Sequence, residues 1–283
     1  MKKWFFLCFL IVGLSSIFII KENKATQIII NEGDTSLSKE NIKLNVSKEQ
    51  IYQGNLLLIN KDTPIQQRFV KEDIVRLYDR SDLTTNYGLL NSEIKLSEEI
   101  AKRFLEMVQA AKEDKVSDFL ISSGFRSYKE QEQLYLENGQ DYALPAGYSE
   151  HNMGLGLDVG STLSKMETAT EGKWIRKNAW KYGFVLRYPK DKTEITGINY
   201  EPWHIRYVGL PHSAIMQEKN FVLEEYLDYL RNEVKLSVTI DQKSFQISYY
   251  PIQNTETIEI PNNTNYEISG NNMDGVIITT FIQ

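Results

Sequence analysis

Two short segments hold two of the three histidines in the chain, and in both a carboxylate lies close by in sequence. The first segment runs from Ser149 to Asp158 and contains His151; the second is Glu201-Pro202-Trp203-His204. Histidine and carboxylate side chains are typical ligands of catalytic zinc. If both segments serve one metal ion, the chain can adopt only those folds that bring these distant segments together.

The spacing inside the first segment restricts its conformation further. His151 and Asp158 are seven positions apart. In a straight strand they would lie roughly 23 Å apart with side chains on opposite faces, and in a helix they would be about 10 Å apart along the axis. Neither arrangement allows bonds of about 2 Å to a shared ion. The chain must therefore bend between them, and Gly154 and Gly156 are the residues that permit such a bend.

The second segment is predicted to be a tight turn. Pro202 is compatible with the first position of a turn but not with a helix interior. Such a turn would direct Glu201 and His204 toward one point, where the imidazole binds a metal and the carboxylate acts as a base. A single histidine is more often a surface or hydrogen-bonded residue. His212, directly after Pro211, is interpreted as such a residue near a helix start.

Arg126 is a further candidate for the site. It lies on a Ser-Gly-Phe-Arg-Ser turn that follows the predicted strand 119–123, and strand ends often present ligand-contacting groups. In a hydrolase that acts on peptide C-termini, a fixed guanidinium stabilises a developing oxyanion or binds a carboxylate through two hydrogen bonds. The alternative is a surface arginine that pairs with an acidic side chain.

Composition excludes some classes of function. The chain has 283 residues, 41% of them hydrophobic and 25% charged, which is enough for one large domain or a main domain with a smaller one. A net charge of -6 argues against a nucleic-acid partner, because such a surface repels phosphates. The only cysteine is Cys8, so no disulfide forms within the chain.

The N-terminus carries a membrane-targeting pattern. Lys2 and Lys3 precede an uncharged run from Trp4 to Ile20, which as a helix would be roughly 25 Å long. Both a cleaved signal and an uncleaved anchor have this pattern. No small-residue cleavage site follows the run, which favours an anchor over residues 1–25. The two lysines place the N-terminus in the cytoplasm, so we expect a single-pass membrane protein with an extracytoplasmic main domain.

The remaining pattern predicts an α+β protein. Residues 26–50 are polar and are predicted to be a linker, 51–235 the main domain, and 236–283 a small all-β appendage. In the main domain we expect a small mixed or antiparallel sheet flanked by helices. Its predicted strands are 56–62, 119–123, 155–159, 184–188 and 204–208, and its predicted helices are 92–112, 128–137, 171–182 and 212–234. The appendage contains five alternating runs: 236–240, 245–250, 257–260, 266–269 and 276–282.

Three sequence blocks resemble the signatures of the LAS group of zinc peptidases, with the closest likeness to VanY-type D-alanyl-D-alanine carboxypeptidases. The likeness covers roughly residues 55–235, and the appendage also resembles the tail of VanY enzymes from glycopeptide resistance. Phe125 departs from the pattern, because related sequences often carry Tyr there. The blocks are Ser122-Ser123-Gly124-Phe125-Arg126-Ser127-Tyr128 with Gln131, Ser149-x-His151-x-x-Gly154-x-x-x-Asp158, and Glu201-Pro202-Trp203-His204-x-Arg206-Tyr207.

The resemblance implies roles for individual residues. It implies one zinc ion per chain held by His151, Asp158 and His204. It implies further that Glu201 is the catalytic base and that Arg126 lies near the scissile carbonyl. Ser149 and Gln131 would then help to hold the terminal D-alanine of the substrate.

The implied activity is metallo-type and not serine-type hydrolysis. It removes the C-terminal D-alanine from pentapeptide stems of peptidoglycan or its lipid-linked precursors, with a link to glycopeptide resistance. The same zinc site would serve an L,D-carboxypeptidase on tetrapeptide stems or a D,D-dipeptidase. A wall-binding module without activity is a further alternative, although binding alone needs no base such as Glu201.

Overall fold

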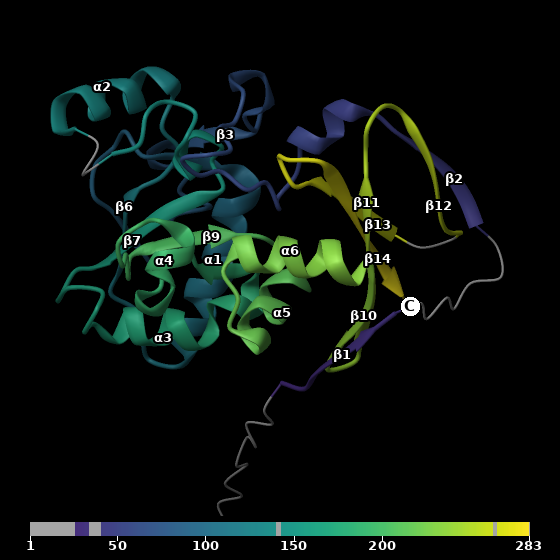
Figure 1. Cartoon of the computed structure of the whole chain (residues 1–283). Coiled ribbons are helices and arrows are strands. Elements are labelled where there is room, and N and C mark those ends of the chain that lie inside the picture. The colour runs from purple at the N-terminus through teal and green to yellow at the C-terminus, as the bar shows by residue number, and fades with distance from the viewer. Residues whose placement is uncertain (1–25, 34–40, 140–142, 263–264, 283) are drawn as a thin grey trace, which may run out of the picture.

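The structure is a computed structural model that describes residues 26–33, 41–139, 143–262 and 265–282. Figure 1 shows a helix-rich part and a second part built mainly of strands, joined side by side. This confirms the predicted α+β class. Among the described residues no helix is both long and apolar enough to cross a membrane. The predicted anchor over residues 1–25 lies outside the described residues.

A five-stranded sheet forms the centre of the helix-rich part. Its strand order is β4-β6-β7-β9-β8; β4 runs parallel to β6 and the other neighbours are antiparallel, so the predicted mixed sheet is confirmed. Four of the five predicted strands of the main domain belong to it. The bounds are β4 Gly88–Leu89, β6 Phe119–Ser123, β7 Gly156–Ser161, β8 Phe184–Leu186 and β9 His204–Tyr207.

Strand alternation separates the core from the site. On β7, Leu157 and Val159 are fully buried in the main hydrophobic core, so Asp158 between them points to the opposite face. On β9, Ile205 belongs to the same core and His204 precedes it on the other face. One face of the sheet is therefore apolar and covered by helices, and the other carries the metal-ligand candidates.

Two helices supply the apolar cover. Helix α1 (Glu98–Glu113) buries Phe104 and Val108, and α3 (Thr170–Asn178) adds Trp174 to the same core.

The predicted helix over 92–112 starts too early, because 95–97 form β5, which pairs with β3. The Ser97 side chain then caps α1 by accepting from the backbone N–H of Ile100. The bounds are β3 Ile74–Arg76 and β5 Lys95–Ser97, and the turn Ala179–Tyr182 completes the predicted helix 171–182.

The predicted helix 128–137 is confirmed as α2 (Tyr128–Asn138), which ends one residue later, whereas the single helix predicted over 212–234 is wrong. That region forms α5 (His212–Lys219) and α6 (Leu223–Glu233). Asn220 ends α5 because its backbone is left-handed, with φ of 52°, and Val222 is extended. The remaining short elements are α4 Thr193–Thr196 and the 3-10 turns Lys48–Tyr52, Gln67–Phe69, Leu77–Asp79, Glu150–Asn152 and Lys190–Lys192.

The part rich in strands is a second five-stranded sheet in the order β1-β10-β11-β14-β13, with all neighbours antiparallel. Strand β12 pairs with β2 in a separate ladder. All five runs predicted in 236–283 are strands. The bounds are β1 Ile28–Glu32, β2 Asn41–Val46, β10 Lys235–Ile240, β11 Lys243–Pro251, β12 Glu256–Pro261, β13 Asn265–Gly270 and β14 Gly275–Ile282.

The prediction of a linker over 26–50 is wrong for the part that the structure describes. Strand β1 pairs with β10, and β2 pairs with β12. Their partner strands lie at the other end of the chain. The residues of β1 and β2, which are short and flanked by polar residues, therefore do not by themselves indicate a strand. The C-terminal sheet also shares a hydrophobic cluster with α5 and α6, in which Ile215 and Leu227 accompany Val238 and Phe245. The domain boundary predicted between residues 235 and 236 therefore divides a single hydrophobic cluster.

The strand predicted over 56–62 is also wrong, although 56–59 are buried as expected. Their backbone groups bond outside any ladder. The N–H of Leu58 donates to Asn271 O (3.2 Å), and the amide of Asn272 donates to the carbonyl of Leu58 (2.8 Å) and to those of Thr63 (3.1 Å) and Pro64 (3.3 Å). The β13–β14 turn thus holds this segment in place.

We expect Asn272→Ala to lower the free energy of unfolding by about 2–4 kcal/mol. The change leaves three carbonyls without this donor and puts alanine on a left-handed backbone, with φ of 64°. Asn86→Ala is the matched control, because Asn86 has φ of 75° but, among the described residues, its side chain takes part in a single hydrogen bond, from the exposed Lys112. Chemical denaturation measures both, and equal losses would show that the carbonyl contacts add nothing.

Candidate active site

Three side chains from different parts of the chain converge above the polar face of the central sheet. His151 comes from the 3-10 turn before β7, Asp158 from β7 and His204 from the start of β9. The distances are 3.5 Å from His151 Nε2 to Asp158 Oδ1 and 2.9 Å from His204 Nδ1 to the same oxygen. One ligand atom from each residue lies within 4.8 Å of the others.

The bend predicted between His151 and Asp158 is present. Gly154 has φ of +76°, and a Cβ there would lie 2.7 Å from Ile74 Cδ1. A Cβ on Gly156 would lie 3.0 Å from His204 Nε2, so glycine lets the second ligand segment approach β7. The chain turns at Gly154 and enters β7 at Gly156, which brings the two ligand candidates together.

The arrangement fits a tetrahedral zinc ion. Two imidazole nitrogens and one carboxylate oxygen are ligands that Zn²⁺ accepts, with bonds of about 2.0–2.2 Å, so their mutual distances should be about 3–4 Å. His151 Nδ1 lies 2.6 Å from Gly124 O, which leaves Nε2 for the metal. In His204 the nitrogen beside Asp158 is Nδ1. His151, Asp158 and His204 would therefore provide the three protein ligands that a catalytic zinc ion requires.

The electrostatics of the two histidines differ. Burial lowers the pKa of His151, against the opposing charge of Asp158. Burial alone would also lower the pKa of His204, but hydrogen bonds to Asp158 and Glu150 outweigh it and raise the pKa to about 9. Burial would raise the pKa of Asp158, but both histidines hold it well below its usual range. The two carboxylates therefore favour a positive charge on His204, whereas burial disfavours it on His151.

Glu201 lies at the edge of this group. As predicted, 201–204 form a turn, in which the N–H of His204 donates to Glu201 O (3.2 Å). The carboxylate Oε2 is 3.9 Å from His204 Nδ1, and the side chain is 29% exposed. Burial raises the pKa of Glu201, with His204 opposing. The carboxylate is thus beside the ligands and open to the cavity, where a base can reach a water molecule.

Arg126 lies in the same cavity and is not a paired surface arginine. Its backbone N–H donates to His151 O (3.0 Å), which ties the turn after β6 to the ligand segment. Its Nε is buried without a hydrogen-bond partner, and among the described residues no carboxylate lies within ion-pair distance. Burial lowers its pKa, while the charges of Asp158 and Glu201 oppose this shift. The guanidinium is therefore available to a ligand.

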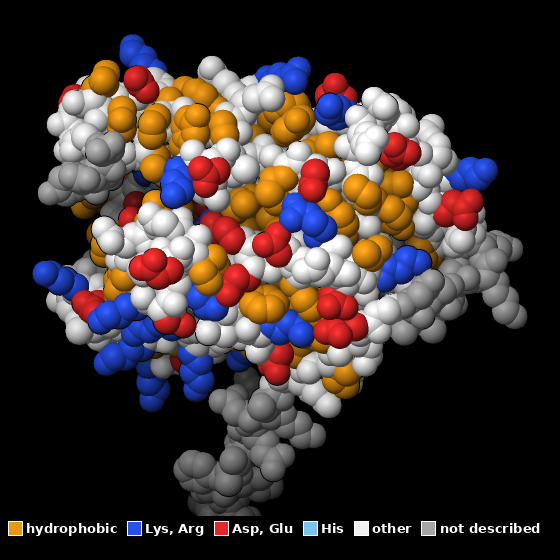
Figure 2. Space-filling model, viewed as in Figure 1, with side chains coloured by type: hydrophobic (Ala, Val, Ile, Leu, Met, Phe, Trp, Pro, Cys, Tyr) orange, Lys and Arg blue, Asp and Glu red, His pale blue; other side chains and the backbone are white. Residues whose placement is uncertain are grey.

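Ser149 and Gln131 complete the predicted set, and both are buried. The amide Nε2 of Gln131 donates to Leu144 O (2.6 Å), whereas its Oε1 has no hydrogen-bond partner among the described residues. The Ser149 hydroxyl accepts from the N–H of His151 (3.4 Å). All seven predicted residues line one cavity of about 800 Å³. In Figure 2 a hollow opens on the left, between the end of α2 and the α4 region.

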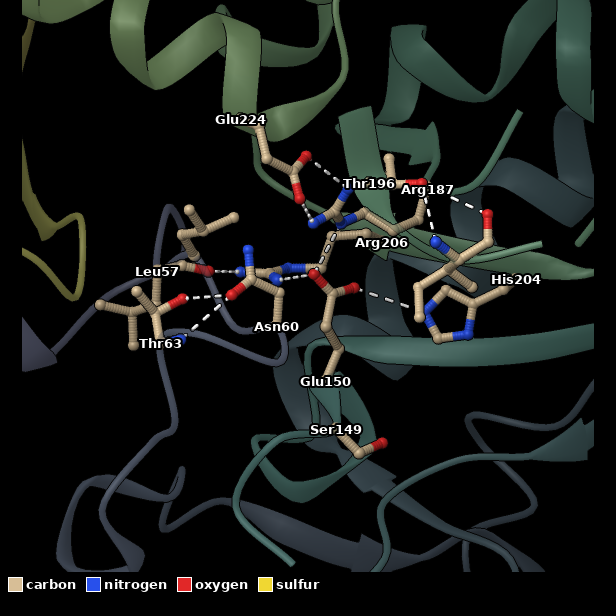
Figure 3. A network of polar contacts seen from close by, with 12 residues as sticks. Leu57, Asn60, Thr63, Ser149, Glu150, Arg187, Thr196, His204, Arg206 and Glu224 are labelled. Carbon is tan, nitrogen blue, oxygen red and sulfur yellow. Dashed lines mark hydrogen bonds and ion pairs between the residues drawn. The ribbon is translucent and has the colours of Figure 1, made fainter. Parts of the chain in front are cut away.

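Sequence reasoning missed the carboxylate behind His204. Glu150 has a fully buried side chain, and its Oε2 is 3.3 Å from His204 Nε2. Two buried arginines bind its other oxygen: Arg206 at 2.6 Å and Arg187 at 2.8 Å. Figure 3 shows this network, which continues from Arg187 to Glu224. Strand alternation was the available signal, because Arg206 follows His204 by two positions and must share its face.

His212 keeps a role away from the cavity, at the start of α5. Its Nδ1 lies 2.6 Å from Tyr226 Oη and its Nε2 lies 3.0 Å from Thr279 Oγ1. Burial lowers its pKa to about 3, so the ring is neutral. The three residues join α5, α6 and β14, which is a structural contact and not a metal site.

Comparison with known sequences places the site in a family. The model of the VanY family, described as D-alanyl-D-alanine carboxypeptidase, matches residues 93–210, which contain all seven residues. A D-alanyl-D-alanine carboxypeptidase of Enterococcus faecium is 62% identical over 236 residues, covering 83% of this chain and 78% of that protein.

Two solved structures are similar to the fold. The vancomycin resistance D,D-dipeptidase VanXYg, in complex with a D-Ala-D-Ala phosphinate analogue, has a TM-score of 0.75 and 33% identity over 86% of this chain and 100% of that one. A variant of the vancomycin resistance D,D-pentapeptidase VanY from a VanB-type resistance cassette, in complex with Zn(II), has a TM-score of 0.51 and 27% identity. The match covers 61% of this chain and 98% of that one. The chain therefore belongs to the VanY family of D-alanyl-D-alanine carboxypeptidases.

Proposed function

We propose that this protein is a zinc-dependent D-alanyl-D-alanine carboxypeptidase that removes the terminal D-alanine from pentapeptide stems of peptidoglycan precursors. The observation that carries the proposal is one cavity containing a His-Asp-His group, the partly exposed carboxylate of Glu201 and the guanidinium of Arg126, whose buried Nε has no partner among the described residues. The Zn(II) bound by the VanY relative and the phosphinate analogue of D-Ala-D-Ala bound by VanXYg support the metal and the substrate class.

The residues divide the reaction among them. His151, Asp158 and His204 would hold one zinc ion per chain, which would supply the Lewis-acid chemistry that activates water and polarises the scissile carbonyl. Glu201 takes the proton of the attacking water and returns it to the nitrogen of the departing D-alanine. Arg126 donates to the oxygen that gains negative charge at the scissile carbonyl.

Two further residues position the substrate. The free atom of Gln131 is the acceptor Oε1, which suits a peptide N–H of the substrate. The hydroxyl of Ser149 lies next to the ligand segment and can donate to the terminal carboxylate. Both contacts would hold the terminal D-alanine between α2 and the metal.

We expect Arg126→Lys to lower kcat/KM by about 10²–10³-fold. Lysine keeps the charge but loses the planar, two-pronged donor that the buried position presents. Release of D-alanine from a pentapeptide measures the effect, with circular dichroism to verify folding. Arg103→Lys is the matched control, because Arg103 is 48% exposed on α1 and pairs with Glu106. A variant with wild-type kcat/KM would remove Arg126 from the reaction.

The substrate test compares three peptides with the zinc-loaded protein, followed by mass spectrometry. Loss of one D-alanine from a pentapeptide stem supports the proposal. The second candidate is a D,D-dipeptidase, favoured by the likeness to VanXYg, and it requires cleavage of free D-Ala-D-Ala. Cleavage of a tetrapeptide alone would indicate an L,D-carboxypeptidase, and no cleavage of any peptide would indicate a wall-binding module.

The proposal includes a location at the cytoplasmic membrane, with the catalytic domain outside. Lys2 and Lys3 followed by the uncharged run from Trp4 to Ile20 support it. Strand β1 begins at Ile28, eight positions after the last residue of this run, so the run lies close in sequence to the sheet. Fractionation of cells expressing the full chain tests the location: membrane-bound activity supports an anchor, and activity in the medium indicates a cleaved signal.

This location fits the substrate, because lipid-linked precursors carry their stem peptides at the outer membrane surface. Removing the terminal D-alanine there would also remove the D-Ala-D-Ala end that glycopeptides bind. We therefore extend the proposal to glycopeptide resistance, supported by the resistance setting named for both structural relatives. Expression in a susceptible host, with growth measured against vancomycin, tests this extension.

A further inference from the structure

Glu150 is a fully buried carboxylate directly behind the metal-ligand candidates, and nothing in the reaction described above uses it. Its two carboxylate oxygens contact different groups. Oε1 accepts from Arg206 (2.6 Å) and from Arg187 Nε (2.8 Å), whereas Oε2 lies 3.3 Å from His204 Nε2. Figure 3 shows the carboxylate between the two guanidinium groups and the imidazole.

The two ring nitrogens of His204 face different carboxylates. Nδ1 faces Asp158 at 2.9 Å, on the side of the proposed metal, and Nε2 faces Glu150. An imidazole that binds a metal through Nδ1 must carry its hydrogen on Nε2. A carboxylate acceptor at Nε2 favours that tautomer and fixes the ring plane. We propose that Glu150 is a positioning residue that holds His204 with an unprotonated Nδ1 aimed at the metal.

The two arginines make a buried carboxylate possible at this point. An isolated buried charge is very unfavourable, and a buried ion pair needs good geometry and further hydrogen bonds. Arg206 meets this condition, because its remaining N–H groups donate to Tyr207 O (3.1 Å), Asn55 O (3.0 Å) and Leu57 O (2.9 Å). Arg206 is thus fixed by backbone from two directions.

Arg187 is fixed by a second carboxylate. Its two terminal nitrogens donate to Glu224 of α6 at 2.8 and 2.7 Å. The four groups together carry two positive and two negative charges, so the cluster is neutral overall. Because both guanidinium groups occupy Oε1 of Glu150, Oε2 remains for His204. A group that served stability alone would not need an oxygen directed at the imidazole.

The network also links the two ligand segments. Glu150 directly precedes His151, and Arg206 follows His204 by two positions. Each segment therefore contributes one metal ligand and one partner of the Glu150–Arg206 pair. The pair fixes the separation of the segments behind the ligands, as Asp158 does on the metal side.

The first test measures zinc affinity of Glu150→Gln by competition with a chromogenic chelator. Glutamine has only one acceptor atom, so it cannot accept from both arginines and from His204 Nε2. We expect affinity to fall by about 10–100-fold, the usual effect of losing such a partner. Glu224→Gln is the matched control: it removes the outer partner of Arg187 but no contact of a ligand, and we expect less than about a threefold change. Equal affinities in Glu150→Gln and wild type would overturn the proposal.

The second test measures the protonation of the histidine ring nitrogens in the wild type. It needs no variant, so it can be carried out even if Glu150→Gln does not fold. The chain has three histidines, so ¹⁵N-histidine NMR of the zinc-loaded wild type gives three ring patterns. We expect His204 to carry a hydrogen on Nε2 that exchanges slowly with solvent. A His204 that carries no hydrogen on Nε2 would overturn the proposal. The inference rests on the proposed function only for the metal, and neither test uses a substrate, so failure of the D-alanine specificity would leave both results intact.

Discussion

Glu201→Gln should keep its zinc and lose most of its turnover, by about 10²–10⁴-fold in kcat. Glutamine has nearly the same shape but cannot accept the proton of the attacking water. Glu201 is not one of the three converging ligand residues, and its carboxylate is 3.9 Å from His204 Nδ1, so metal content should stay at one equivalent per chain. D-Alanine release from a pentapeptide and metal analysis of the same sample measure both quantities.

Glu194→Gln provides the control for this experiment. Glu194 is an exposed glutamate on α4 and does not line the active-site cavity. We expect it to retain wild-type kcat and zinc. A Glu201→Gln protein that turned over at the wild-type rate would show that another group acts as the base. A variant without zinc would instead show that Glu201 is itself a ligand.

Removal of the metal should abolish activity, with a loss of at least about 10³-fold. Lewis-acid stabilisation contributes several kcal/mol, and each 1.4 kcal/mol corresponds to a factor of ten in rate. Incubation of the wild type with a chelator should remove activity, and added Zn²⁺ should restore it. His151→Ala removes one of the three ligands, so added Zn²⁺ should not restore its activity. Kinetics together with metal analysis measure the result.

The third histidine gives a control that separates metal loss from loss of stability. His212→Gln disturbs the buried contacts with Tyr226 and Thr279 but touches no ligand candidate. We expect a lower Tm with one equivalent of zinc and near-normal kcat for the folded fraction. Wild-type activity that persisted after complete chelation would contradict a metal mechanism.

Local patterns predicted the elements that depend on local interactions. The helix predicted over 128–137 is present as α2, where Ser127 and Glu130 cap its N-terminus reciprocally. The strand at 119–123 was recognisable from its apolar start, and the strand at 204–208 from its alternation of polar and apolar residues. The need for a bend between His151 and Asp158 followed from bond lengths, since two residues seven positions apart cannot share a metal in regular structure, and Gly154 and Gly156 indicated where it lies.

Elements whose partners lie far away in sequence could not be predicted in this way. The strand Ile28–Glu32 is paired with β10 from the opposite end of the chain. Its own residues therefore led to the prediction of a linker. The segment 56–59 is as apolar as a strand, but its backbone bonds to Arg206, Asn271 and Ser269 and not to a ladder. Asn220 divides the predicted helix 212–234, although asparagine inside a helical pattern is only a weak signal.

The sequence by itself determined the chemical groups of the site: which histidines and carboxylates could bind a metal, and that glycine must lie between His151 and Asp158. Only the tertiary structure decided how those groups are held. It placed Glu150 behind His204 and brought Arg206 and Arg187 to that carboxylate. The physical reason is that ligand chemistry is a property of single side chains, whereas a buried charge is stable only where partners from other segments neutralise it.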